Sequence, residues 1–383
     1  MEETRDIISL IRYCLSGDTP ALSEDPLSAG SVETILRVSK RHDLRHMTGW
    51  ALKQLSVPLP EPAVQSVDAD IFAATSRYAG LKHDITGICG LLENAQIDHL
   101  PLKGAVVRDL YPQKWMRTSS DIDILIRKAD LSRATDILLE NGYRKTGNNY
   151  HDIAFLSPGG NRLELHFNIR EDMPDMDAVL DTVWEHTVAV SGTRYRYEMT
   201  REFLVFHTVA HMAYHFVHGG CGIRPFLDLF LIRQKLPGDE AQIAQLLARA
   251  GLTDFYSGAL ALIGVWFEDA PHTELTRCME EYILYGGVFG NPDNEAVVRQ
   301  GQAKSKLHLY IRRIFPPLSH MRKKYPILQS VPILLPVFWL RRIAESLLPE
   351  NRARNAREWQ VVRETEPAAA AEFANMMRSL NLT

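Results

Sequence analysis

Residues 121–126 read Asp-Ile-Asp-Ile-Leu-Ile, an apolar run that opens with two carboxylates. Strand side chains alternate between two faces, so Asp121 and Asp123 would share one face while Ile122 and Ile124 point to the other. Two neighbouring anions repel each other unless a cation lies between them. The pattern therefore predicts a strand with one face in a core and a divalent metal on the other. The alternative is a strand whose solvent face simply carries two aspartates.

A predicted β-hairpin supplies a third acid. Residues 151–156 and 162–168 are strand-like, and the turn-forming residues 157–161 (Ser-Pro-Gly-Gly-Asn) separate them. In the second strand Glu164 and His166 share one face by the same alternation. If this strand lies beside residues 121–126, Glu164 joins the two aspartates. Three such carboxylates can hold two Mg²⁺ ions that also bind substrate phosphates.

Helices are predicted on both sides of these strands. The apolar spacing and the capping residues indicate helices at residues 64–92, 131–140 (capped by Asp130), 201–217, 225–236, 240–250 and 254–267. A short strand candidate at residues 99–102 runs into Lys103-Gly104, and residues 109–117 look irregular. A chain of 383 residues suits two or three domains. We expect a helical region at 1–95, an α/β core at 96–192, a helical domain at 193–300 and a basic helical region at 301–383.

The composition is that of an ordinary folded, soluble protein, with 45% hydrophobic and 23% charged residues. A net charge of −4 gives no global attraction for nucleic acid. The four cysteines are scattered without metal-ligand or disulfide spacing, which indicates reduced thiols in a cytoplasmic protein. The polar N-terminus is unlike a secretory signal. The most apolar segment, 325–340, is broken by three prolines and is shorter than the about 20 residues of a membrane span, so we predict no transmembrane segment.

A basic segment lies near the C-terminus. Residues 304–357 contain twelve Lys/Arg and two acids, a local charge of +10. The segment has three interpretations: a solvated face, a site for an anionic partner such as RNA or a phosphorylated acceptor, and an interfacial membrane patch built on Val331 to Leu340. It lacks the interleaved aromatic residues typical of single-strand binding, so nucleic acid is not the favoured partner.

The motifs in combination resemble the uncharacterised branch of the DNA polymerase beta-type nucleotidyltransferase superfamily. The residues that carry the resemblance are Leu102-Lys103-Gly104-Ala105, Tyr111, Arg117, the 121–126 strand and Leu163-Glu164-Leu165-His166, within roughly residues 80–190. The resemblance implies an α+β fold, with a small mixed β-sheet core and α-helical N-terminal and C-terminal regions. It also implies metal-dependent transfer of a nucleoside monophosphate from an NTP, ATP among the candidates, to an acceptor hydroxyl with release of pyrophosphate.

The resemblance also implies roles for individual residues. Asp121 and Asp123 would bind two Mg²⁺ ions, with Mn²⁺ as the alternative, and Glu164 would ligate one metal or act as the base on the acceptor hydroxyl. Gly104 would let the backbone approach the triphosphate. The superfamily's usual Gly-Ser pair is here Gly104-Ala105, so the phosphate-binding hydroxyl is missing. The phosphate contacts expected in its place are Lys103, Arg117, Ser119 and Ser120. For Lys103 the alternative is a solvated lysine, and for Arg117 a salt bridge to a nearby acid.

Histidines form a second pattern. His207, His211 and His215 recur every four residues on one predicted helix, a spacing at which histidines can ligate zinc. Without a zinc-protease glutamate or a cysteine at ligand spacing, a stripe that faces the cleft is favoured. We therefore expect His211 and His215 to contact substrate, with Arg224 and Asp228 on the next helix as candidate partners.

His166 lies on the carboxylate face of its strand, where it either contacts substrate or is a packed, hydrogen-bonded histidine.

The sequence is compatible with two functions. The favoured one is a cytoplasmic nucleotidyltransferase, because all three acids are present. The alternative is a catalytically inactive module with the same fold that binds a nucleotide or a partner protein, because the Gly-Ser hydroxyl is absent. The acceptor and the choice of NTP are not encoded in any motif of the chain.

Overall fold

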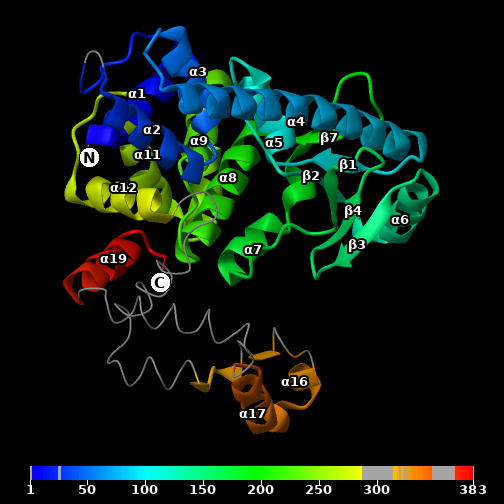
Figure 1. The fold of residues 1–383 in the computed structure, drawn as a ribbon. Helices are drawn as coiled ribbons and strands as arrows, with labels where there is room; N and C mark the ends of the chain where they lie inside the picture. The colour runs from blue at the N-terminus through cyan, green and yellow to red at the C-terminus, as the bar shows by residue number, and fades with distance from the viewer. Residues whose placement is uncertain are drawn as a thin grey trace.

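The computed structural model describes residues 2–24, 27–286, 314–318, 321–322, 325, 327–346 and 367–382. Figure 1 shows a small sheet on one side of a larger body of helices, with the long helix α4 running across both. The chain is thus mixed helix and sheet, and the predicted α+β class is confirmed.

The main sheet has five strands in the order β1-β2-β5-β4-β3. Their bounds are β1 His99–Pro101, β2 Asp121–Ile126, β3 Arg144–Asn148, β4 Asp152–Leu156 and β5 Arg162–His166. The predicted hairpin is β4–β5, and β5 lies beside β2 in parallel, with Asp123 directly opposite Glu164. Two features were not predicted from the sequence: β3, a largely exposed edge strand, and a separate pair formed by β6 (Thr187–Ala189) and β7 (Tyr197–Met199).

Alternation along β2 separates a core from a polar face, as predicted. Ile122, Ile124 and Ile126 are buried in a core between the sheet and two helices, α4 (Glu61–Asn94) and α6 (Leu131–Glu140). Burying these side chains removes apolar surface from water and fixes the register, because a slip of one residue would expose them. The two aspartates are thereby held on the opposite face.

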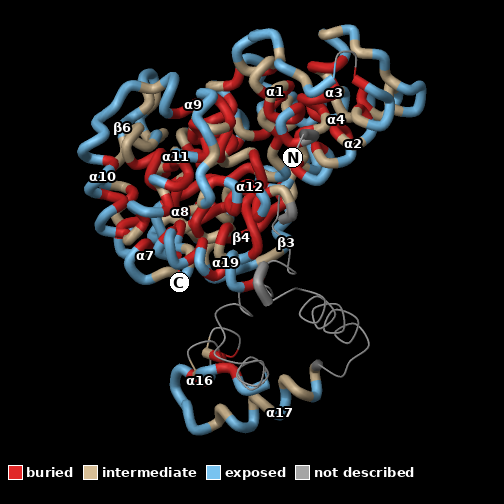
Figure 2. Tube along the Cα trace, turned by 90° about the vertical axis from the view of Figure 1, so that its left-hand side faces the viewer, coloured by how far each residue is buried: buried red, intermediate tan, exposed pale blue. Residues whose placement is uncertain are grey.

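The remaining helices share one larger core. The N-terminal helices are α1 (Glu2–Ser16), α2 (Ala29–Arg41) and α3 (Arg45–Gln54). The later helices are α7 (Pro174–Leu180), α8 (Arg201–Val217), α9 (Arg224–Lys235), α10 (Glu240–Arg249), α11 (Thr253–Phe267), α12 (Glu274–Gly286) and α19 (Pro367–Ser379). Figure 2 shows the buried residues running continuously through this body, where α1, α8 and α11 contribute to a single cluster. The four-part domain division stays a prediction.

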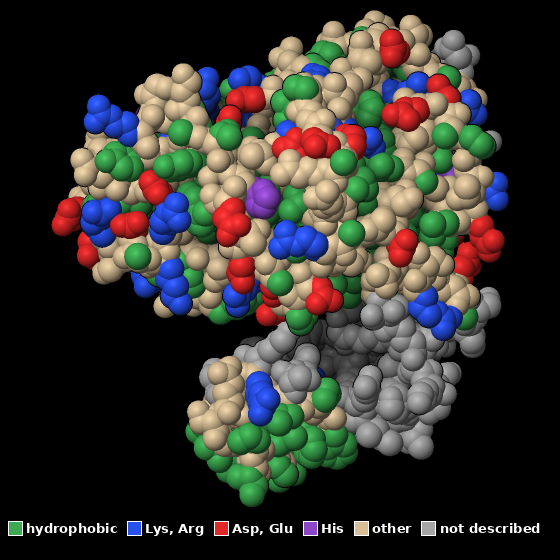
Figure 3. All heavy atoms as spheres, turned by 180° about the vertical axis from the view of Figure 1, so that it is seen from behind, with side chains coloured by type: hydrophobic (Ala, Val, Ile, Leu, Met, Phe, Trp, Pro, Cys, Tyr) green, Lys and Arg blue, Asp and Glu red, His purple; other side chains and the backbone are tan. Residues whose placement is uncertain are grey.

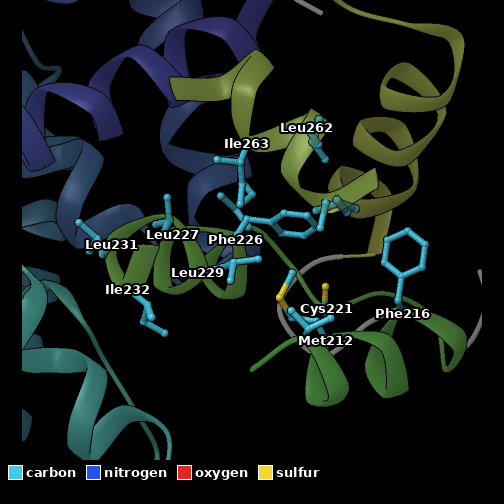
Figure 4. Packing of buried hydrophobic residues seen from close by; sticks show 14 of the residues in the cluster. Met212, Phe216, Cys221, Phe226, Leu227, Leu229, Leu231, Ile232, Leu262 and Ile263 are labelled. Carbon is cyan, nitrogen blue, oxygen red and sulfur yellow. The ribbon is translucent and has the colours of Figure 1, made fainter. Parts of the chain in front are cut away.

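Close packing of α8, α9 and α11 fixes the helices nearest the polar face of the sheet. Figure 4 shows Phe226 of α9 directed toward α11, with Met212 and Cys221 beneath it. The Phe226 ring lies 5.2 Å from that of Trp266, centroid to centroid, in an edge-on contact. Such aromatic pairs add to the free energy gained from area burial. The packing holds the start of α9, which carries Arg224 and Asp228, in one position.

Short helices connect the strands. They are α5 (Gly104–Val107) and the 3-10 helices at Arg108–Leu110, Lys114–Met116, Lys128–Asp130 and Val183–His186. The segment 109–117, expected to be irregular, therefore contains two single turns.

Towards the C-terminus the described elements are α16 (Ile327–Ser330), a 3-10 turn (Pro332–Leu334) and α17 (Leu335–Ser346). Figure 3 shows hydrophobic side chains gathered on this part, and Ile333 and Leu340 are 84% and 68% exposed. Of the twelve basic residues in 304–357 only Arg322, Arg341 and Arg342 lie among the described residues, so the role of that segment stays a prediction. No helix in the described ranges has both the length and the apolarity needed to cross a membrane.

Candidate active site

The structure brings the three predicted acids together at the polar face of β2 and β5. Asp123 is buried, and its Oδ1 lies 3.0 Å from Nε2 of His166. The same His166 nitrogen lies 3.5 Å from Oε2 of Glu164, so one imidazole bridges the two carboxylates. Asp121 precedes Asp123 by two residues on the same face, and both line a cavity of about 560 Å³. The hydrogen-bonded alternative for His166 is therefore what the structure shows.

The charges of these groups are strongly coupled. Although burial opposes it, Lys103 and His166 together hold the pKa of Asp123 well below its usual range. Burial and the negative charges of Asp123 and Glu164 raise the pKa of Asp121. The hydrogen bonds that His166 donates to the two carboxylates outweigh burial and raise the pKa of His166 to about 9. The positive charges of Lys103 and His166 therefore stabilise the ionised form of Asp121 less than those of Asp123 and Glu164.

The donor set fits a hard divalent cation. Ligand atoms of Asp123, Glu164 and His166 all lie within 4.8 Å of one another. Carboxylate oxygens are the ligands that Mg²⁺ prefers, and it commonly binds one or two of them together with substrate phosphates. A cation here would also relieve the repulsion that raises the pKa of Asp121. Asp123 and Glu164 are thus compatible with the predicted metal site, whereas Asp121 does not belong to this group of ligand atoms.

The Lys103-Gly104 turn lies beside the acids. Lys103 has a φ of 48°, a left-handed conformation that costs a non-glycine residue free energy. It places Nζ 3.6 Å from Oδ2 of Asp123, so Lys103 is paired rather than solvated. A Cβ on Gly104 would lie 3.3 Å from Cβ of Ser119 and 3.5 Å from Nη1 of Arg117. Glycine at this position lets the turn pack closely on the 117–120 loop.

The other expected phosphate contacts line the cavity but already have partners. The Arg117 guanidinium donates from Nε and Nη2 to Asp228, at 2.7–2.9 Å. Ser119 Oγ accepts from Nη2 of Arg108 at 2.6 Å, and Ser120 Oγ donates to Oδ2 of Asp121 at 3.2 Å. The salt-bridge alternative for Arg117 is thus what the structure shows.

The histidine stripe faces the same region, as predicted, but its partners differ. His207, His211 and His215 line the cavity. His211 Nδ1 lies 2.7 Å from Oε1 of Glu171, and its Nε2 lies 3.2 Å from Nε2 of His215. Burial, with the positive charge of Lys103 contributing, lowers the pKa of each of the three histidines to about 3. We therefore expect neutral imidazoles at neutral pH.

Arg224 and Asp228 were the wrong partners for that stripe. Within the described chain Arg224 donates to the Thr118 carbonyl and pairs with Asp43, while Asp228 pairs with Arg117. Glu171, the actual partner of His211, lies in a loop after β5 and belongs to no motif. A helical spacing reveals which residues share a face but not what that face meets.

A second, smaller cavity of about 200 Å³ shares part of its lining with the larger one. The two cavities share Lys103, His207 and His211. Glu164 and His166 line only the smaller cavity, whereas Asp121 and Asp123 line only the larger. Tyr150, Glu171 and Tyr214 are among the other residues of the smaller cavity. Glu164 is therefore reached from the smaller cavity, whereas Asp121 and Asp123 are reached from the larger one.

No motif in the sequence indicated that several of the residues lining the larger cavity belong to the site. Lys40, Arg41 and Asp43 come from the end of α2 and the turn after it, and Arg77 comes from α4. They reach the site only because α2, α3 and α4 pack against it. The N-terminal helices thus contribute directly to the cavity.

The neutral histidines predict loss of stability in acid. His207 is buried with a pKa of about 3, against an ordinary 6.5, so below pH 6.5 the unfolded chain binds a proton that the folded chain does not. Stability from this group is present above pH 6.5 and is lost as the pH falls toward 3. We expect His207→Gln to make the pH dependence of unfolding free energy shallower by about 1.4 kcal/mol per pH unit between pH 6 and 4.

Urea unfolding at several pH values measures this slope, with His83→Gln, at an exposed position on α4, as the control. Equal slopes for His207→Gln and wild type would contradict the neutral, buried state of His207.

Comparison with known protein families gives a match. A family model described as an uncharacterised nucleotidyltransferase matches residues 28–268, more than half of the chain. The matched range contains all three acids, the Lys103-Gly104 turn and the histidine stripe. No curated protein gives a significant match, and neither does any solved structure.

Proposed function

The chain belongs to the uncharacterised nucleotidyltransferase family, and we propose that it is a metal-dependent enzyme that transfers a nucleoside monophosphate from an NTP to an acceptor hydroxyl, releasing pyrophosphate. One observation carries this proposal. The parallel register of β2 and β5 places Asp123 directly opposite Glu164, with Asp121 on the same face. Three acids on one face of the sheet repel one another, and besides Lys103 and His166 a bound cation would relieve the repulsion that raises the pKa of Asp121.

Asp121, Asp123 and Glu164 are the proposed metal ligands for two Mg²⁺ ions, with Mn²⁺ as the alternative. When bound, such ions activate an attacking hydroxyl and neutralise the charge of the leaving pyrophosphate. His166 orients the site, because its Nε2 contacts both Asp123 and Glu164. Lys103 supplies a further positive charge next to Asp123.

The larger cavity suits the NTP. Its volume of about 560 Å³ lies in the usual range of small-molecule sites, roughly 300–1,000 Å³. Gly104, Arg117, Ser119 and Ser120 line it together with the aspartate pair. We propose that Lys103, Ser119 and Ser120 contact phosphate and that Arg117, held by Asp228, shapes this wall.

The smaller cavity suits the acceptor hydroxyl. Attack on the α-phosphorus requires the nucleophile and the leaving group to lie on opposite sides of it. Glu164 faces the smaller cavity, and the hydrogen bond from His166 lowers its pKa, so it is ionised and able to accept a proton. The neutral His211, shared by both cavities, and His215 are the proposed substrate contacts.

One observation favours the alternative of an inactive binding module. Ala105 leaves the turn without a hydroxyl, and Lys103 is already paired with Asp123. Such a module would bind a nucleotide without cleaving it, so turnover distinguishes the two functions.

Metal removal tests the proposal. We expect the purified full chain, incubated with Mg²⁺ and each α-labelled NTP in turn, to release pyrophosphate from at least one NTP, to water or to its own side chains in the absence of the true acceptor. EDTA should abolish the release and added Mg²⁺ or Mn²⁺ should restore it, because the acids cannot hold the triphosphate without a cation. Release that is insensitive to EDTA, or NTP binding without any release, would contradict the proposed metal-dependent reaction.

A further inference from the structure

The larger cavity has an unusual distribution of positive charge. Lys40, Arg41 and Arg77 line it, are exposed, and have no side-chain partner among the described residues. The other cations of the cavity are engaged: Arg117 by Asp228, Arg224 by Asp43 and Lys103 by Asp123. We call Lys40, Arg41 and Arg77 the cationic rim. The cavity therefore combines acids on the strand with unpaired cations from two N-terminal helices.

The end of α2 is fixed against the loop that precedes β2. Asp43, just after the helix, has a left-handed φ of 53°. Its Oδ2 accepts a hydrogen bond from Oγ1 of Thr118 at 2.7 Å and lies 3.2 Å from Nη2 of Arg224. These contacts hold Lys40 and Arg41 next to the segment that carries Ser119 and Ser120. Their place at the cavity thus follows from a defined turn rather than from a freely moving tail.

Helix α4 is docked on the same loop. The guanidinium of Arg108 lies 5.8 Å from the centre of the Tyr78 ring, a cation–π contact. The same guanidinium donates to Ser119 at 2.6 Å. Arg77, the neighbour of Tyr78, therefore reaches the cavity from the opposite helix. Lys40, Arg41 and Arg77 thus line the same cavity as Ser119 and Ser120, which immediately precede Asp121.

We propose that the cationic rim binds the β- and γ-phosphates of the NTP and the pyrophosphate formed from them, an inference that rests on the proposed function. A triphosphate is the most highly charged part of either substrate, and charge-assisted hydrogen bonds to phosphate are among the strongest polar contacts. Arg suits this role because its guanidinium can contact two phosphate oxygens at once.

The rim does not suit the acceptor. Glu164, the proposed base, faces the smaller cavity. There the lining Arg170 is already paired with Asp181 at 2.5 Å, and the acids Glu164 and Glu171 lie alongside. Of the Lys and Arg side chains that line either cavity, those without a side-chain partner in the described ranges line only the larger one. The N-terminal helices would thus distinguish an NTP from a nucleoside or its monophosphate.

Binding of inorganic tripolyphosphate tests the rim without knowledge of the preferred base. We expect the triple variant Lys40→Ala/Arg41→Ala/Arg77→Ala to bind tripolyphosphate and the NTPs at least about tenfold more weakly by calorimetry in Mg²⁺. Its affinity for the unphosphorylated nucleosides should equal that of wild type. The charge-matched control is Arg5→Ala/Arg37→Ala/Arg144→Ala, at exposed positions outside both cavities, which should bind like wild type.

If the triple variant bound tripolyphosphate and the NTPs as tightly as the control variant does, the proposed role of the rim would be overturned. An equal loss of nucleoside affinity would overturn it as well, since that would indicate a damaged cavity. The proposed function can fail separately from the rim. If wild type bound tripolyphosphate but bound no NTP and released no pyrophosphate, nucleotidyl transfer would be rejected. Weaker tripolyphosphate binding by the triple variant would in that case still support the rim as a polyphosphate site.

Discussion

Replacing Asp123 by asparagine is expected to lower the rate of pyrophosphate release by about a thousandfold, the loss typical for a key electrostatic group in an active site. Asparagine keeps the shape of the side chain but removes the negative charge that lies beside Lys103 and His166. It also removes a proposed metal ligand. The measurement is release of labelled pyrophosphate from each NTP, compared with wild type at the same Mg²⁺ concentration.

The matched control is Asp84→Asn on α4. Asp84 is also a buried aspartate, but it lines neither cavity and accepts hydrogen bonds from Ser157 and Asn161. We expect this variant to keep the wild-type rate. Asp123→Ala is a poorer choice, because alanine removes not only the charge but also the oxygen that accepts a hydrogen bond from the buried His166. If Asp123→Asn, still folded, released pyrophosphate as fast as wild type, the inactive-module alternative would be preferred and any turnover would come from elsewhere.

The sequence predicted the central part of the sheet because its signal is local. Strand β2 spans residues 121–126, as the alternation indicated, and α6 and α8 have the predicted bounds. The pairing of the strands, in contrast, is not a local property of the sequence. The alternation of β5 shows which face Glu164 occupies, but the register that sets it opposite Asp123 depends on a chain crossing through α6, β3 and β4. The edge strand β3 escaped prediction because its polar residues pack against little.

The site was predictable where chemistry is concentrated in a motif, and not where it is assembled from distant helices. The acids and the Lys103-Gly104 turn are recognisable in one sequence. The Arg117–Asp228 pair joins positions 111 residues apart, and no local pattern indicates it. The cationic rim similarly appears as ordinary surface charge on α2 and α4 until the fold brings it to the cavity.

Replacing Asp228 by alanine is expected to reduce the free energy of unfolding by about 3–5 kcal/mol, the cost of leaving a buried charge without its partner. Asp228 accepts hydrogen bonds from Nε and Nη2 of Arg117 and from the Tyr111 hydroxyl at 2.7 Å. The side chains of Arg117 and Asp228 are only 10% and 8% exposed, so water cannot replace the lost carboxylate. Urea unfolding of the variant and of wild type gives the difference.

A surface pair with similar geometry provides the control. Arg170 contacts both oxygens of Asp181, but these side chains are 53% and 40% exposed, so Asp181→Ala should cost about 1 kcal/mol or less. Replacing both buried partners, Arg117→Met with Asp228→Leu, should recover much of the stability lost in Asp228→Ala, because no uncompensated charge remains. The result also decides the role of Arg117. A loss near that of Asp181→Ala would mean that Asp228 does not hold the guanidinium, which would then be free to contact phosphate. A loss of several kcal/mol would identify Arg117 as the residue that joins α9 to the cavity wall.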